Sequence, residues 1–210
     1  TWSIPQRPPL WPAKKRERID WALQKYYILM KQLEWLNDDR IPFLDLATGT
    51  EIFAECFGCK VSRPEDNNPF ACPAVHNSAE AAKIKKPKIE DTPLTLLFDM
   101  ADELKKQAGK DVLLRLPDIQ SPMDITALIW DKNDFYLAMI DDPVAVKELS
   151  LIIREFLIEF LDMWLKRYGG EFIAHYPDYY MTEGVTLSED EVGIVSASTF
   201  NEFFLPELKE

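Results

Sequence analysis

The sequence predicts an α/β fold with parallel strands, because short apolar runs alternate with segments of helical periodicity. Three runs have the length and composition of buried strands: Ile41–Leu46, Val112–Leu116 and Phe172–Ala174. Segments with apolar residues on one helical face lie before and between these runs. This order implies parallel pairing through right-handed crossovers. A (β/α)₈ barrel and a doubly wound sheet both fit it.

The first element is a proline-rich arm followed by a helix. Residues 1–13 carry four prolines, which predicts an extended segment. From Lys14 to Asn37 apolar side chains recur at three- and four-residue spacing, the period of one helical face. They are Ile19, Leu23, Tyr26, Met30 and Leu33. Residues 1–40 are therefore predicted as an N-terminal arm and helix.

Capping residues, prolines and glycines predict the boundaries of the next helices. Thr48-Gly49-Thr50 ends the first apolar run and precedes a helix over Glu51–Phe57, which Gly58 stops. Thr92-Pro93 supplies a capping hydroxyl and a first-turn proline for a helix that ends at Gly109. These residues lie at the ends of the helices themselves, so they predict where each helix begins or stops.

The second half of the chain holds the longest predicted helix. Pro122 opens a shorter helix to Trp130, and Asp142-Pro143 then starts a long one that Gly169-Gly170 closes. Its apolar stripe is wide enough to pack on a sheet. Gly193–Val195 is a candidate fourth strand, and a last helix is expected from near Ser196.

Composition limits the partners that we expect. The 210 residues are 47% hydrophobic, enough for one sizeable core, and the net charge is −12. An acidic surface repels phosphate backbones and anionic lipid, so neither nucleic acid nor a membrane is an expected partner. No apolar run approaches the roughly 20 residues of a membrane span, and the N-terminus lacks an apolar signal region. Three cysteines fit the reducing cytoplasm better than a disulfide framework.

Four segments, from about residue 40 to the end, resemble the uroporphyrinogen decarboxylase superfamily. They are Ala54–Cys59, Leu116–Asp124, Met139–Pro143, and the set Ser196, Phe200, Phe203, Leu205 and Pro206. The last set is similar to the family signature Ser-x-x-x-Phe-x-x-Phe-x-Leu-Pro. The resemblance implies a (β/α)₈ TIM barrel, a fold that takes about 250 residues. We therefore expect residues 41–210 to be the N-terminal half of a truncated barrel.

The family includes the decarboxylase and corrinoid- or coenzyme-M-linked methyltransferases. The decarboxylase requires an arginine-rich N-terminal segment and an Asp after the first strand, where this chain has Gly49 or Thr50, with Asp45 earlier. The resemblance therefore favours a methyltransferase-type enzyme acting on a small organic or corrinoid-linked substrate. The alternative is a non-catalytic member that binds a ligand or partner.

The resemblance also implies cofactors and partners. The zinc ligands of the methyltransferases lie in the second half of the barrel, so zinc and corrinoid are expected only in the full-length protein. A corrinoid protein is the implied macromolecular partner. A half-barrel would leave an open edge strand, which must be covered or paired with another copy, so a homo-oligomer is also expected.

Candidate site residues follow or face the ends of strands, because barrels place their function at the C-terminal ends. We predict His175, Asp178 and Asp190 as catalytic residues, with histidine suited to proton transfer near neutrality. Asp118, Gln120 and Tyr179 are predicted to bind substrate. The structural alternatives are a hydrogen-bonded strand-end histidine and, for Asp118, a helix cap.

The cysteines also match a metal-binding spacing. Cys56-x-x-Cys59 followed by Cys72 and His76 has the pattern of a zinc site, which needs four ligands around a tetrahedron. Cys56 falls on an apolar helix face and Cys59 follows the terminating Gly58, so the two thiols should point differently. We predict that these residues bind no zinc.

Overall fold

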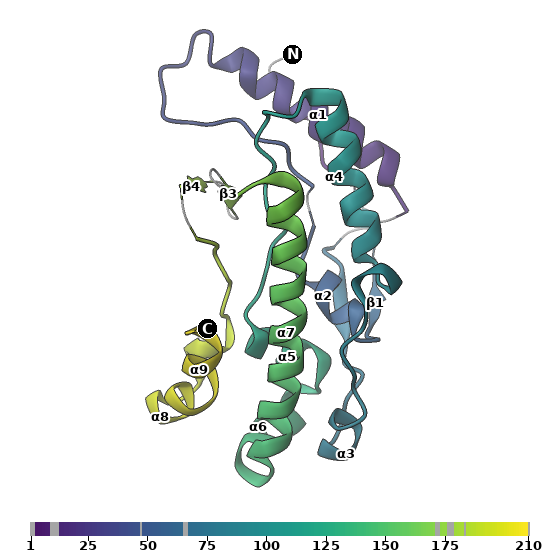
Figure 1. The fold of residues 1–210 in the computed structure, drawn as a ribbon, viewed down its shortest axis with the longest axis vertical. Coiled ribbons are helices and arrows are strands. Elements are labelled where there is room, and N and C mark those ends of the chain that lie inside the picture. The colour runs from purple at the N-terminus through teal and green to yellow at the C-terminus, as the bar shows by residue number, and fades with distance from the viewer. Residues whose placement is uncertain are drawn as a thin grey trace.

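The computed structural model describes residues 3–8, 13–46, 48–64, 67–170, 173–175, 179–182 and 184–209 (Figure 1). The described elements are α1 (Lys15–Gln32), α2 (Glu51–Cys56), β1 (Lys60–Ser62), β2 (Phe70–Cys72), α3 (Ser78–Ala81), η1 (Ile89–Asp91), α4 (Leu94–Ala108), α5 (Pro122–Ile129), α6 (Lys132–Asp141), α7 (Pro143–Tyr168), β3 (Ile173–His175), β4 (Tyr179–Met181), η2 (Glu191–Ile194), α8 (Ala197–Thr199), the π-helix η3 (Phe200–Phe204) and α9 (Leu205–Leu208). None of the helices among these residues is long and apolar enough to cross a membrane.

The starts of α5 and α7 follow from capping chemistry in the sequence, whereas Thr50 before α2 makes no side-chain cap. The Ser121 side chain accepts a hydrogen bond from the Asp124 backbone N–H at the start of α5, and Asp142 does the same for Ala145 at the start of α7. Gly169 ends α7 with a φ of 87°, a conformation that favours glycine. Helix α1 ends at Gln32, short of the predicted Asn37.

Isolated parallel bridges join the extended segments of the chain. Leu44 pairs with Leu114, as predicted for the first two apolar runs, through hydrogen bonds from Leu44 N to Leu113 O (2.8 Å) and from Arg115 N to Leu44 O (2.9 Å). A second bridge joins Gln120 to Ser188. The chain from 112 to 120 therefore lies between residues near 44 and residues near 188.

The prediction that Phe172–Ala174 is a parallel neighbour of these segments is wrong. Phe172 lies outside the described residues, and Ile173–His175 forms β3, which pairs with β4 in an antiparallel hairpin. The partner strand, Tyr179–Met181, follows closely in the sequence, and antiparallel strands can pair without a crossover helix. The apolar run therefore pairs locally, and the segment near Ser188 takes the expected parallel position.

The predicted strand at Gly193–Val195 is also wrong, because Glu191–Ile194 forms the 3₁₀ helix η2. The Asp124 carboxylate accepts hydrogen bonds from the backbone N–H groups of Asp190 and Glu191. Asp124 thus satisfies the free N–H donors at the start of this helical turn. The short apolar pattern at Gly193–Val195 gives no sign of this distant contact.

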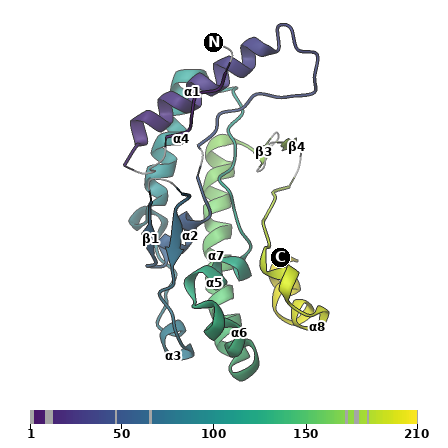
Figure 2. The same ribbon diagram turned by 180° about the vertical axis from the view of Figure 1, so that it is seen from behind.

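Helix α7 organises the core. It runs along the long axis of the molecule, with α5 and α6 near its start and the β3–β4 hairpin near its end (Figures 1 and 2). Its buried face meets α4 through Phe98, whose ring centroid lies 5.7 Å from that of Phe160, and it meets α2 through further aromatic pairs. Phe160 lies edge-on to Phe53 with 5.3 Å between ring centroids, and Phe156 does the same to Phe57 at 5.2 Å. These contacts hold α2, and the turn before it, at a fixed place beside the parallel segments.

Candidate functional site

A small cavity lies where the first two parallel segments end. Its volume is about 200 Å³, and it is lined by Arg7, Arg18, Thr48, Gly49, Thr50, Glu51, Asn68, Pro69, Arg115 and Asp118. Residues 48–51 follow the segment that contains Leu44, and Arg115 and Asp118 follow Leu114. The cavity therefore lies at the C-terminal ends of two parallel segments, the position at which proteins with parallel sheets place their ligands.

Arg115 is fixed in the cavity wall by a buried ion pair. Its Nη2 lies 2.9 Å from Asp45 Oδ1, and Lys25 Nζ lies 2.8 Å from Asp45 Oδ2. The side chains of Asp45 and Arg115 are only 5% and 8% exposed. One carboxylate thus orients two cations that belong to α1 and to the second parallel segment.

Two further arginines come from the N-terminal part of the chain. Arg18, on α1, is 3% exposed, and burial followed by the nearby charge of Arg7 lowers its pKa to about 10, against the opposing effect of Glu51. It therefore remains cationic at neutral pH. Arg7 is exposed and donates a hydrogen bond to Asn68 Oδ1 at 3.2 Å. The guanidinium groups of the arm, α1 and the second parallel segment thus line one cavity.

Two carboxyl groups share the cavity with these arginines. Glu51 is 3% exposed, and burial raises its pKa. Burial also raises the pKa of Asp118, although the nearby Arg115 opposes this effect. The Glu51 carboxylate lies so close to Gly49 that a Cβ there would collide with it. The cavity therefore carries three guanidinium groups against two carboxyl groups with raised pKa, in a chain of net charge −12.

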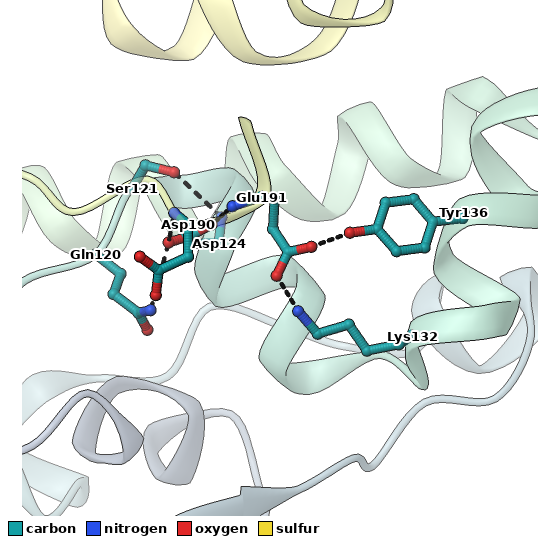
Figure 3. A network of polar contacts seen from close by, with 7 residues as sticks. All are labelled: Gln120, Ser121, Asp124, Lys132, Tyr136, Asp190 and Glu191. Carbon is teal, nitrogen blue, oxygen red and sulfur yellow. Dashed lines mark hydrogen bonds and ion pairs between the residues drawn. The ribbon is translucent and has the colours of Figure 1, made fainter. Parts of the chain in front are cut away.

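A second polar cluster lies beyond the cavity, at the N-terminal end of α5 (Figure 3). Asp124 is 2% exposed and accepts hydrogen bonds from the backbone N–H groups of Asp190 (2.7 Å) and Glu191 (3.0 Å). Gln120 Nε2 donates to the same carboxylate at 3.3 Å. Asp124 therefore joins the second parallel segment to the segment that follows Ser188.

Acidic side chains on that later segment complete the cluster. Glu191 accepts a hydrogen bond from Tyr136 and forms an ion pair with Lys132, both on α6. Glu189 accepts a hydrogen bond from the Ser121 hydroxyl. Burial, and then the neighbouring Asp124, raises the pKa of Glu189 to about 8.

The structure places three of the predicted site residues on these adjoining segments. Asp118 lines the cavity and accepts a 3.5 Å hydrogen bond from the Ser188 hydroxyl. Gln120 is buried against Asp124. Asp190 is exposed, and its backbone N–H is bound by Asp124.

The other three predicted residues belong to the β3–β4 region. Asp178 lies outside the described residues, and the structure describes only the backbone of His175 and Tyr179, which pair with each other in the hairpin. The hairpin lies near the end of α7, whereas α5 lies closer to its start (Figure 1). The prediction that all six residues share one pocket stays a prediction.

Sequence reasoning missed the arginines of the cavity and the carboxyl group of Asp124, whereas it grouped Glu189 with Asp190 and Glu191 as a candidate cluster. One signal was present for Arg115. It stands within the apolar run Val112–Leu116, and Asp45 stands within Ile41–Leu46. A charged residue in each of two neighbouring buried strands predicts an ion pair between them, because a buried charge requires a partner.

The predicted absence of zinc at the cysteines remains a prediction. Cys56 Sγ lies 3.1 Å from the backbone oxygen of Ile52, and burial raises the pKa of Cys56 to about 12 and that of Cys59 to about 11. Without a metal ion, both groups are therefore neutral thiols near neutral pH. Across the described ranges, no group of three His, Cys, Asp or Glu side chains is placed to hold a metal ion.

These observations define an α/β protein with a cation-lined cavity at the end of parallel segments, and comparison with known proteins identifies its family. Residues 37–210 match the family described as Uroporphyrinogen decarboxylase (URO-D), and the chain belongs to that family. This confirms the resemblance found in the sequence.

A solved structure of a methyltransferase from Methanosarcina mazei has a similar fold, with a TM-score of 0.69 and 11% sequence identity over 96% of this chain. The match covers 55% of that methyltransferase chain, so the present chain spans about half of its length. No curated protein matches the sequence.

Proposed function

We propose that this chain supplies the ligand-binding mouth of a (β/α)₈-barrel enzyme of the methyltransferase type. Its substrate would be a small organic or corrinoid-linked molecule that carries an anionic group. The observation that carries the proposal is the convergence of Arg7, Arg18 and Arg115 on one cavity at the ends of two parallel segments.

The chemistry of the cavity favours a carboxylate or phosphate group as its ligand. A guanidinium presents donors in a planar fork that matches both groups, and it remains charged at neutral pH. Arg115 is held by Asp45, and Arg18 is buried in α1, so neither side chain needs to be ordered when the ligand binds. Arg7 is exposed on the N-terminal arm and would close over the bound anion.

We retain the proton-transfer role for the residues predicted from the sequence. In this proposal His175 serves as acid, base or hydrogen-bond donor, Asp178 and Asp190 orient it, and Gln120 and Tyr179 contact the substrate. Asp118 would stand between the arginines and the reacting group, since it lines the cavity. We assign no metal to the described residues. In the full-length protein, zinc and corrinoid would be held outside this chain, with a corrinoid protein as the partner.

A titration with simple anions tests the binding site. Inorganic phosphate and succinate are titrated into the wild-type protein, Arg7→Gln and Arg40→Gln by calorimetry. Arg40 is a matched control because it is a partly exposed arginine outside the cavity, paired with Asp38. We expect at least one anion to bind, and Arg7→Gln to weaken its binding about tenfold to a hundredfold, the effect of losing one charge-assisted hydrogen bond. Equal affinities in the three proteins would contradict the proposal.

A second assay separates the enzyme from the alternative, a non-catalytic binding member of the family. The full-length protein is mixed with reduced corrinoid and candidate methyl donors, and methylation of the corrinoid is followed by its visible absorbance. The proposal expects transfer that His175→Ala slows while the melting temperature stays nearly unchanged. Anion binding without transfer from any donor would favour the non-catalytic member.

A further inference from the structure

The segment 188–191 is attached to the N-terminal end of α5 largely through carboxyl groups. Asp124 binds the backbone N–H groups of Asp190 and Glu191, and the Ser121 hydroxyl donates to Glu189 Oε2 (Figure 3 shows all but Glu189). Ser188 adds backbone hydrogen bonds, donating to Ile119 O at 2.9 Å and accepting from Ser121 N at 2.8 Å. The attachment therefore depends on acidic groups that lie close to one another.

Glu189 occupies an unusual position in this attachment. Its carboxyl group lies near Asp124, because the Ser121 hydroxyl that donates to Glu189 also accepts from the Asp124 N–H, and the next residue, Asp190, donates its N–H to the Asp124 carboxylate. Its Oε1 atom is buried and accepts no hydrogen bond from any group in the described part of the chain. The Asp124 oxygens already accept hydrogen bonds from two backbone N–H groups and from Gln120. Two ionised carboxylates would repel here, whereas one proton on Glu189 would replace that repulsion with a hydrogen bond.

The nearby cation Lys132 is shared among several acidic groups, because its charge also acts on Asp124 and Asp190. Lys132, on α6, forms an ion pair with Glu191, which also accepts the hydrogen bond from Tyr136. Asp190, on the same segment, adds a further negative charge beside Glu189. The surrounding charges therefore favour a protonated carboxyl over a second carboxylate.

We propose that residues 188–191 form a proton-dependent latch, closed while one proton is shared between Glu189 and Asp124 and opened when that proton is lost. Burial and Asp124 raise the pKa of Glu189 to about 8, in agreement with the geometry. A carboxyl whose pKa is raised in the closed state favours closure at low pH, and this advantage is lost as the pH rises from its ordinary pKa, 4.5, through about 8.

The latch is connected to the arginine-lined cavity through Ser188. Its hydroxyl donates to the Asp118 carboxylate, and Asp118 lines the cavity. Opening of the latch would remove this hydrogen bond and expose the edge of the cavity at Asp118. In the proposed binding site, the side of the cavity at Asp118 would therefore be closed at low pH and open at high pH. The contacts that form the latch involve none of the arginines.

Hydrogen–deuterium exchange of the peptide 185–195 tests the latch. The exchange rate is measured at about pH 6 and about pH 9 and corrected for the chemical exchange rate. We expect the opening constant of the wild-type segment to rise on the order of tenfold to a hundredfold across this range. The opening constant of a control peptide from α7 should change little between the two pH values. An unchanged opening constant for 185–195 would overturn the proposal without any variant.

The Glu189→Gln variant identifies the proton. A glutamine amide donates to Asp124 and accepts from Ser121 at every pH, so the variant should stay closed at about pH 9 and lose the pH dependence. Glu202→Gln is the matched control, because Glu202 is an exposed carboxylate on η3 that pairs with Lys147. It should keep the wild-type profile. The same pH dependence in Glu189→Gln as in the wild type would refute the role of Glu189, while anion binding tested through Arg7 would be unaffected.

Discussion

Removal of the Asp45 carboxylate should test how the cavity is built. Asp45→Asn removes the charged carboxylate that contacts both Lys25 and Arg115, whose side chains are only 14% and 8% exposed. The loss of one partner from a buried ion pair costs about 3–5 kcal/mol. The ion pairs at 2.8 and 2.9 Å place this site in that range, so we expect the free energy of unfolding to fall by about 3–5 kcal/mol.

The assay is urea-induced unfolding followed by tryptophan fluorescence. Asp38→Asn is the control, because Asp38 pairs with Arg40 at a much more exposed site and such pairs contribute about 0–1 kcal/mol. Arg115→Met should cost less than Asp45→Asn, since Asp45 would keep its contact with Lys25. A loss below about 1 kcal/mol for Asp45→Asn would refute the idea that a buried ion pair fixes Arg115 in the cavity wall.

Three further predictions concern the core, the reaction and the cysteines. Phe160→Ala should cost about 3–5 kcal/mol in urea unfolding, because its ring is fully buried between α2 and α4, whereas Ile158→Ala on the exposed side of α7 should cost little. We predict that the full-length protein does not convert uroporphyrinogen to coproporphyrinogen, since the resemblance aligns Gly49 or Thr50 with the Asp of the decarboxylase; detectable product would overturn this. Metal analysis should find no zinc that is lost on Cys→Ser changes at Cys56 and Cys59.

Local chemistry explains what the sequence revealed about the fold. The helix starts at Pro122 and Pro143 and the end at Gly169 depend on residues within one turn of each boundary, so they could be predicted. The parallel pairing of Leu44 with Leu114 follows from two apolar runs joined by helices. These features need no knowledge of distant contacts.

The third parallel segment could not be found in the same way. The residues near Ser188 are polar, with Ser188, Glu189 and Asp190 in sequence, and they form no apolar run. Their place beside Gln120 is set by hydrogen bonds to Ile119 and Ser121 across about 70 residues of chain. The apolar run that starts at Phe172 was the stronger local signal, but its described part pairs in a hairpin.

The candidate site was predictable only for the residues that follow strands. Asp118 lines the cavity because it follows the second parallel segment, the position at which parallel α/β proteins place their site residues. Arg7 and Arg18 come from the N-terminal arm and α1, whose approach to the cavity depends on tertiary packing. Trp21 contributes to this packing through a 2.9 Å hydrogen bond from its indole N–H to the backbone oxygen of Pro5.

The central claim is that the three arginines bind one anionic group. The most direct measurement is a nuclear magnetic resonance titration of the arginine Nε–H signals with succinate and with its neutral diamide, succinamide. We predict that the signals of Arg18 and Arg115 shift with succinate and not with succinamide, and that the signal of Arg40 stays in place. Shifts of equal size with both compounds, or no shift at Arg18 and Arg115 with succinate, would contradict the account.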